Sequence, residues 1–170
     1  MIRLIAVTML MLAMLTGPFK AMAHEPMTPD RMLQILQAID PEAAVEGTLM
    51  QVTIEEIPVL IVFDPIADRM RAITPIRSAE GLGPEELLRM MQANFDTTLD
   101  ARYGIAQGKL WASYIHPLSP LDKNGLLSGL GQVVNLALSY GSTYSSGAFS
   151  FGGGDSRALI DDLLKKGEKI

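Results

Sequence analysis

The sequence predicts an α+β domain in which helices pack on one antiparallel sheet of about five strands. Segments with apolar residues at helical spacing alternate with short β-rich segments, in the order helix, three strands, helix, two strands, helix and a last short helix. The connections between consecutive strands are too short for a parallel crossover, so these strands should pair antiparallel. A chain of 170 residues without Cys is long enough for one core without disulfides.

Residues 1–23 have the pattern of a cleavable secretory signal. An apolar run over residues 4–15 follows Arg3, a Gly-Pro pair ends it, and small residues stand at Ala21 and Ala23. The run is shorter than the roughly 18 to 20 residues that span a bilayer. No Cys is present for lipid attachment. We therefore expect cleavage after Ala23, export to the periplasm or the medium, and no stable membrane anchor after cleavage.

The chain is acidic, with 14 Lys and Arg against 19 Asp and Glu and a formal net charge of −5. Removal of residues 1–23 would take away Arg3 and Lys20 but no acidic residue, which shifts the charge to −7. An acidic chain without clusters of Lys and Arg offers little to phosphate backbones or anionic lipids, so nucleic acid is not an expected partner. Partners with basic or apolar surfaces fit this balance better.

The first expected helix begins at Thr28-Pro29 and ends near residue 40. Thr28 can act as N-cap, and Pro29 suits the first helical position. The apolar residues that follow recur at helical spacing and form one stripe: Met32, Ile35, Leu36 and Ile39.

Three strands are expected next. Alternation of apolar and polar residues predicts strands over residues 50–54 and 69–76, and a β-rich run predicts a strand over 57–63 between them. Polar turns at 55–56 and 64–68 connect them. Such short turns imply a meander with its most apolar strand in the middle.

A second helix is expected to begin at Pro84, with two glutamates near the positive end of its dipole. Two strands over 101–106 and 110–116 should then form a hairpin, with Gly108 supplying a positive φ in the turn. The residues expected to form the buried stripe of the second helix are Leu87, Leu88, Met91 and Phe95.

The third helix is expected from a cap at Ser119, followed by Pro120 and the acidic Asp122, and it continues to residue 138. Glycines inside a helix each cost about 1 kcal/mol relative to Ala, so packing must hold this one together. Those glycines are Gly125, Gly129 and Gly131.

Residues 141–155 are rich in Gly and Ser and predict a flexible tether to a C-terminal helix within 156–170. Aromatic residues in and beside this segment leave open that it is pinned to the sheet or meets a partner. The terminal helix could fold back or be offered to another protein, and folding back is favoured because so short a helix is marginal in water. The aromatic residues are Tyr140, Tyr144, Phe149 and Phe151, and the apolar side of the helix has Leu159, Ile160, Leu163 and Leu164.

The order of elements, together with two local patterns, resembles the type III secretion chaperone-like superfamily over residues 29–140. The patterns are Leu-Leu-x-x-Met-x-x-Asn at 87–94 and a hairpin with Tyr-Gly-Ile at 103–105 and Leu-Trp-Ala at 110–112. Within that superfamily the chain is most similar to the bacterial sensory transduction regulator family. The resemblance implies a homodimeric domain, residues 24–140, that binds protein segments, and it implies no active-site residue.

An alternative function is an N-terminal-His copper-binding envelope protein. Cleavage after Ala23 would make His24 the first residue, whose α-amine and ring nitrogen can chelate copper with a second His. His116 is the only other His in the chain. The contrasting interpretation gives His24 no ligand role and His116 a hydrogen bond at a strand end, and we assign neither a metal.

The sequence shows no catalytic constellation. The neighbouring carboxylates lie in expected turns or on a polar helix face, where an acid–base pair with separated pKa values is not expected. No Gly-x-Ser-x-Gly turn is present, and the triple Gly at 152–154 does not match a phosphate-binding loop. The sequence therefore predicts no enzyme and no cofactor. The carboxylates considered are Glu55, Glu56, Asp64, Asp68, Asp161 and Asp162.

Trp111 and Tyr114 are an odd number of residues apart in one expected strand, so their side chains should lie on opposite faces of the sheet. One of them could then lie on an open face as a docking point, although cover by a helix or by a dimer mate is more common. Taken together, the sequence predicts an exported, non-enzymatic domain that binds protein segments as a homodimer.

Overall fold

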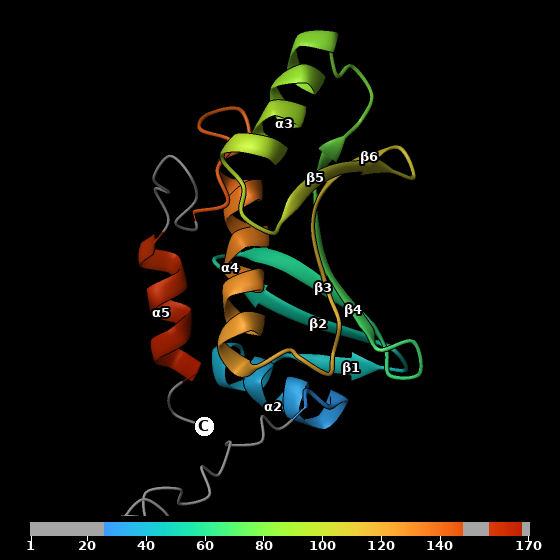
Figure 1. Cartoon of the computed structure of the whole chain (residues 1–170), viewed down its shortest axis with the longest axis vertical. Helices are drawn as coiled ribbons and strands as arrows, with labels where there is room; N and C mark the ends of the chain where they lie inside the picture. Colours follow the sequence, from blue (N-terminus) through green and yellow to red (C-terminus); the bar gives the residue numbers. More distant parts are fainter. Residues whose placement is uncertain (1–25, 148–156, 168–170) are drawn as a thin grey trace, which may run out of the picture.

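The computed structural model describes residues 26–147 and 157–167, which fold as six antiparallel strands with helices on one face (Figure 1). The helices are α2 (Pro29–Ile39), α3 (Pro84–Asp96), α4 (Lys123–Leu138) and α5 (Arg157–Gly167). The strands are β1 (Ala44–Glu46), β2 (Leu49–Ile54), β3 (Ile57–Asp64), β4 (Arg69–Ser78), β5 (Arg102–Ala106) and β6 (Lys109–His116). The predicted signal over 1–23 lies outside the described residues, as do Phe149 and Phe151.

The strands lie in the order β1-β2-β3-β4-β6-β5. The predicted meander is present as β2, β3 and β4, with the most apolar strand, β3, in the middle. The hairpin of β5 and β6 then returns so that β6 pairs with β4 and β5 becomes an edge. The sheet has one strand more than expected, because the three-residue β1 is too short to show alternation in the sequence.

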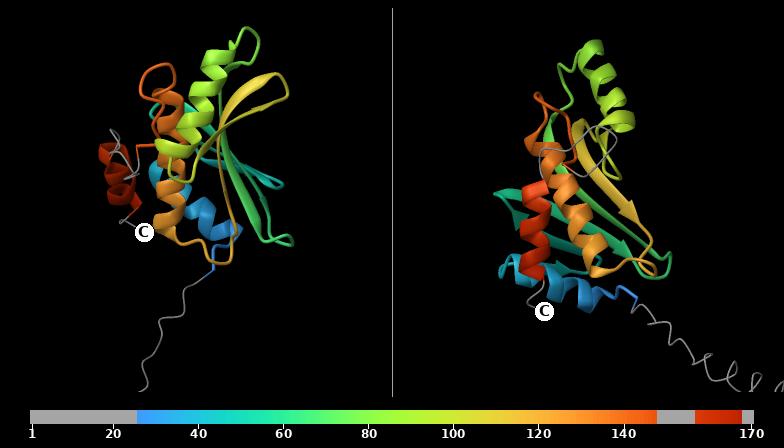
Figure 2. Two further views of the ribbon diagram at one scale, coloured as in Figure 1. Left: turned by 45° about the horizontal axis from the view of Figure 1, so that its top comes forward. Right: turned by 60° about the vertical axis from the view of Figure 1, so that its left-hand side comes forward.

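The helices form two layers on one face of the sheet. Figure 1 shows α4 lying between the sheet and α5, with α2 at one end and α3 at the other. Figure 2 shows α5 alongside α4 in both further views, in agreement with the extensive contacts between these two helices. We call the side of the sheet under α2 and α4 the covered face, and the other side the open face.

The core lies between the covered face and α4. Every second residue of the central strands is buried there, so the predicted alternation is confirmed in β2 and β4. The most closely packed point is Gly129 of α4, where an added Cβ would lie 2.4 Å from the ring of Tyr114. The buried strand residues include Met50, Val52, Ile54, Val59, Ile61, Phe63, Met70, Ala72, Leu110, Ala112 and Tyr114.

The start of α2 is as predicted, since Thr28 Oγ1 accepts a hydrogen bond from Arg31 N at 3.2 Å. The start of α4 is not. Asp122, rather than Ser119, is its N-cap and accepts from Gly125 N at 2.6 Å. Ser119 instead donates from its hydroxyl and its backbone N–H to the carboxylate of Asp68, both at 2.7 Å, and these bonds lower the pKa of Asp68.

The predicted buried stripe of α3 is wrong for three of its four residues, since only Leu87 packs against the core. Met90 and Ala93 are its buried residues, whereas Leu88, Met91 and Phe95 are 60%, 56% and 88% exposed. This helix has apolar residues on two sides, and helical periodicity alone does not indicate which side meets the sheet.

The first part of the predicted tether, residues 141–147, packs on the domain. Asn135 Nδ2 donates to Ser145 O at 2.6 Å, and Thr97 Oγ1 donates to Tyr144 O at 2.6 Å. Tyr144 also lies edge-on to Tyr103 and Tyr140. This segment is therefore pinned between the ends of α3 and α4, the alternative that its aromatic residues left open. The rest of the expected tether, 148–155, lies outside the described residues.

The C-terminal helix folds back on the domain, as its length favoured. Leu163 of α5 is fully buried, and Leu159 and Leu164 pack partly buried against the core. Lys123 Nζ donates to Gly167 O at 2.8 Å and caps the end of the helix. None of the helices in the described ranges has the length and hydropathy needed to cross a membrane.

Candidate protein-binding surfaces

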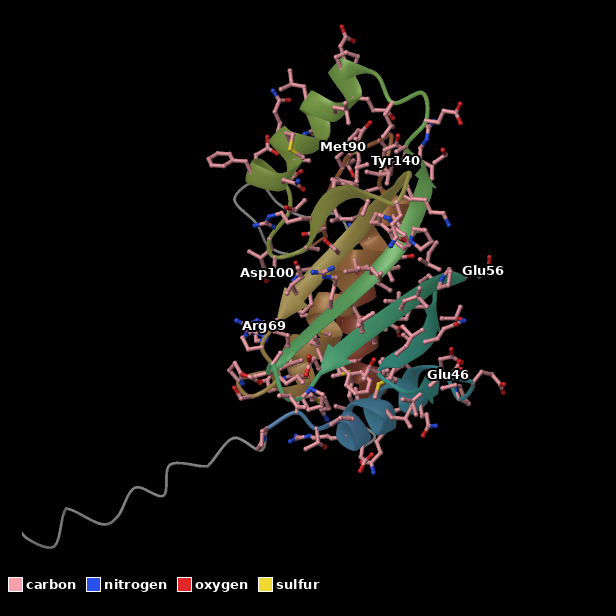
Figure 3. All side chains as sticks on the ribbon, turned by 90° about the vertical axis from the view of Figure 1, so that its right-hand side faces the viewer. Glu46, Glu56, Arg69, Met90, Asp100 and Tyr140 are labelled. Atoms are coloured by element: carbon pink, nitrogen blue, oxygen red, sulfur yellow. The ribbon has the colours of Figure 1, made fainter. Side chains whose placement is uncertain are left out.

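The open face is the first candidate site. In the register of the sheet, Arg71 of β4 lies directly opposite Val62 of β3 on one side and Ile115 of β6 on the other. Leu49 of β2 extends the same row beyond Val62. Figure 3 looks onto this face, and the strands there lie in front of α4.

The apolar side chains of the open face are exposed to a degree that a covered sheet would not show. Val62 is 45% exposed, Ile115 is 54% exposed and Leu49 is 37% exposed. Ile73 lies in the next row, between Leu60 and Ser113. Contiguous exposed apolar residues on a sheet mark a surface that a partner can cover.

Two shallow hollows divide the open face. One, of about 480 Å³, lies over the ends of β3 and β4, and the other, of about 250 Å³, lies over β5 and β6. Arg71, Ile73 and Ile115 line both hollows, so they form the ridge between them. A bound segment could place side chains on both sides of this ridge.

Trp111 belongs to the second hollow, whereas Tyr114 is buried on the covered face. The predicted placement of these two rings on opposite faces is thus confirmed. Trp111 Nε1 donates to Ala106 O at 2.9 Å, and Lys109 Nζ lies 5.9 Å from the ring centre. The indole is fixed at the rim of the open face, with its ring available to a partner.

The second candidate surface is the outer side of α3, which we call the α3 stripe: Leu88, Met91 and Phe95. These residues follow each other by three and four positions and therefore lie on one side of the helix. An apolar hollow of about 280 Å³ lies beside them, between α3 and β5, and Ile105 lines it at 53% exposure. This surface adjoins the open face at the edge strand β5, because Gly104 and Ile105 line both this hollow and the second hollow of the open face.

Asn94 closes part of the edge beside the α3 stripe. Its side chain accepts from Tyr103 N at 2.8 Å and donates to Tyr103 O at 3.1 Å. A single amide thus replaces the missing strand neighbour near the start of β5, which limits pairing along this edge. The Asn of the Leu-Leu-x-x-Met-x-x-Asn pattern therefore has a structural role.

The histidines do not form a metal centre in the described part of the chain. His116 Nδ1 donates to Pro117 O at 2.7 Å, and its ring stacks on Tyr114. His24 lies outside the described residues. Within 26–147 and 157–167 no three potential ligands among His, Cys, Asp and Glu come together. The copper alternative thus gains no support.

The carboxylates singled out in the sequence are dispersed rather than paired as acid and base. Glu55 and Glu56 form a tight turn, both with positive φ, and Asp64 caps the next turn through Ile66 N at 2.9 Å. Asp162 pairs with Lys166 on α5 at 2.8 Å. These carboxylates stabilise turns and helix surfaces.

Burial changes the ionisation of two tyrosines. It raises the pKa of Tyr114 to about 12, with smaller contributions from the charges of Asp100 and Asp122. Burial also raises the pKa of Tyr103, whose hydroxyl donates to Leu136 O at 2.9 Å. Both phenols are therefore neutral core groups near neutral pH.

The sequence missed Arg71 as a candidate. Its position between Val62 and Ile115 depends on β6 pairing with β4, and strands that distant in the sequence show no local sign of their register. The alternation of Arg69, Arg71 and Ile73 could have indicated a shared face.

No model of a known protein family matches the chain, and no curated protein sequence matches it significantly. Similar folds occur among solved structures. The type III secretion chaperone SycH of Yersinia pestis, in complex with a fragment of YscM2, is 14% identical at a TM-score of 0.49, over 64% of this chain and 98% of that one.

Two further structures are similar at slightly higher TM-scores. The HopA1–SchA chaperone–effector complex gives 0.52 at 12% identity, over 65% of this chain and 91% of that one. The ExsC–ExsE complex gives 0.50 at 13% identity, over 64% and 89%. Identity this low is evidence of fold alone. The chain shares the α+β fold of the HopA1–SchA and ExsC–ExsE structures.

Proposed function

We propose that this chain is an exported, non-enzymatic domain that binds segments of partner proteins on its open face and dimerises through the α3 stripe. The observation that carries the binding role is the row of Leu49, Val62 and Ile115, left uncovered on a sheet whose other face holds the buried core. The HopA1–SchA chaperone–effector complex and the ExsC–ExsE complex, which have the same fold, support a protein ligand.

The absence of enzyme activity is part of the proposal. It is supported by the dispersed carboxylates and by His116, whose ring stacks on Tyr114 and bonds to Pro117 O rather than facing a hydroxyl. Export is supported by the signal pattern of residues 1–23. The finer similarity to sensory transduction regulators stays a prediction from the sequence.

A peptide selection tests the binding role. Random 12-residue peptides displayed on phage would be selected on the chain from residue 24 onward, and we expect peptides that bind at micromolar affinity. Val62→Ser with Ile115→Ser should weaken them at least tenfold, because the apolar contact area is lost. Leu138→Ser, on α4 and 52% exposed, is the matched control. Failure to select any peptide sensitive to the open-face change would contradict the proposal.

Expression with residues 1–23 in a Gram-negative bacterium tests export. We expect the protein in the periplasmic fraction, and its intact mass should equal that of a chain that begins at His24. A protein that stays in the cytoplasm at full length would remove export from the proposal and leave the binding role to be judged separately.

The dimer is proposed through the α3 stripe, because these three large apolar side chains protrude beside an apolar hollow. Light scattering after size exclusion should give twice the chain mass at micromolar concentration. Leu88→Asp with Phe95→Asp should give folded monomers with an unchanged circular dichroism spectrum, since both residues are exposed. Val62→Ser with Ile115→Ser is the control that should leave the dimer intact, and the reverse pattern would place the interface on the open face.

A further inference from the structure

We propose that the open face selects acidic, apolar peptide segments, with a carboxylate of the partner pairing with Arg71 and flanking apolar side chains entering the two hollows. This inference rests on the proposed protein-binding function and names the class of segment that is bound. An acidic segment differs from the basic or apolar partner that the net charge of the whole chain favours.

The position of Arg71 is the first step. Its neighbours across the sheet are Val62 and Ile115, and Ile73 lies two residues further along β4 on the same face. Directly opposed side chains in a sheet are about 4.5 to 5.5 Å apart at Cβ. Arg71 is therefore surrounded by apolar side chains on the ridge between the two hollows.

The second step is the pairing of Arg71 within the part of the chain that the structure describes. Arg71 forms no hydrogen bond or ion pair with any residue in the described ranges, unlike Arg77 and Arg89, which pair with Glu86 and Asp96. Arg102 of β5, on the same face, is satisfied internally, by Thr98 Oγ1 at 3.0 Å and two backbone carbonyls at 2.8 Å. Among the described residues, none therefore accepts a hydrogen bond from the guanidinium of Arg71, which lies at the centre of the open face.

The cost of covering an unpaired charge decides the chemistry of the partner. Any segment that buries Val62 and Ile115 also removes water from the guanidinium of Arg71, which has five N–H donors and no acceptor. Burying a charge without a partner is strongly unfavourable, whereas a carboxylate can accept two parallel hydrogen bonds from the guanidinium. A segment that brings a carboxylate to the ridge is therefore preferred over an uncharged one.

The charges around Arg71 favour the same partner. The side chains on the open face include Arg69, Arg102 and Lys109, against Asp64 opposite Arg69 and Glu46 at the edge. This surface is locally basic on a chain whose net charge is −5. Figure 3 shows Arg69 at the end of the face, beside the first hollow. A partner with basic residues would meet like charges here.

The test uses peptides selected as above on the chain from residue 24 onward. We expect the selected sequences to be enriched in Asp and Glu together with Ile, Leu, Val or Phe, relative to the starting library. Titration with fluorescent versions of the best peptides should show at least tenfold weaker binding to Arg71→Gln. Arg71→Lys should fall in between, because it keeps the charge but not the bidentate geometry. Lys165→Gln, an exposed charge on α5, is the matched control and should not change the affinity.

The possible results distinguish a failure of the preference for acidic segments from a failure of the proposed protein-binding role. Peptides that depend on Ile115 but lose less than threefold in Arg71→Gln, or that lack acidic residues, would overturn the inference and leave the binding role standing. Peptides insensitive to both changes would overturn both. Equal weakening by Arg71→Gln and Lys165→Gln would show non-specific attraction between charges and would also overturn the inference.

Discussion

The two faces of the sheet contain similar apolar residues but differ in what lies opposite them. On the covered face, Tyr114 meets the backbone of Gly129 so closely that an added Cβ would lie 2.4 Å from the ring. On the open face, Val62 and Ile115 flank a free guanidinium and remain about half exposed. The difference indicates that the first face stabilises the fold and the second is available for binding.

The comparison is tested most directly by shortening one large side chain beside each face. Leu130 of α4 is fully buried, so Leu130→Ala should lower the free energy of unfolding by about 2–5 kcal/mol through lost contact and a residual cavity. Ile115→Ala, on the open face, should change it by about 0.5 kcal/mol or less. Urea denaturation followed by circular dichroism measures both. Equal losses would mean that the open face is also part of the stabilising core.

Adding one methyl group to a glycine on each side gives the next effect in size. Gly129→Ala should destabilise the domain by about 1–3 kcal/mol, because the new Cβ overlaps the ring of Tyr114. Gly104→Ala, in β5 on the open face, meets nothing within 4 Å and should be neutral or slightly stabilising. Thermal unfolding of the two variants measures the difference, and a tolerated Gly129→Ala would contradict close packing of α4 on the sheet.

The sequence predicted the parts of the fold that depend on neighbouring residues. The cap at Thr28 and the alternation through Met50, Val52 and Ile54 are local signals, and both are present in the structure. The strand pairing of β4 with β6 is not local. The binding surface around Arg71 is built by that pairing, so the sequence indicated only that Trp111 and Tyr114 would lie on opposite faces.

Two errors have the same physical origin. Leu88, Met91 and Phe95 form a helical stripe that is as regular as a buried one, and only the sheet beneath α3 decides which side is covered. Residues 141–147 have the composition of a linker, yet Thr97 and Tyr144 bond across 47 positions of sequence. Composition and periodicity describe what a segment offers, whereas its contacts depend on the rest of the chain.

Alkaline pH should destabilise the covered face rather than the open face, because the buried phenols of Tyr103 and Tyr114 lie on the covered face. The pKa of Tyr114 is raised to about 12 in the folded state, against about 10 in the unfolded chain. The neutral phenol of Tyr114 therefore makes its full contribution to the free energy of unfolding below pH 10, and this contribution is lost as the pH rises toward 12. We expect a loss of about 1 kcal/mol from this group by pH 11. Tyr114→Phe should show a correspondingly shallower decline in urea denaturation between pH 9 and pH 11, and parallel curves would contradict the shift.

The smallest expected effect concerns Arg71. Its guanidinium has no partner in the described residues, so Arg71→Gln leaves no buried group unsatisfied and removes a charge near Arg69. We expect the free energy of unfolding to change by less than about 0.5 kcal/mol, with an unchanged dependence on urea concentration. A loss above about 1 kcal/mol would show that Arg71 stabilises the fold, and weaker peptide binding by this variant would then reflect damage to the sheet. An unchanged stability combined with weaker binding would place Arg71 among the residues that act only when a partner covers the open face.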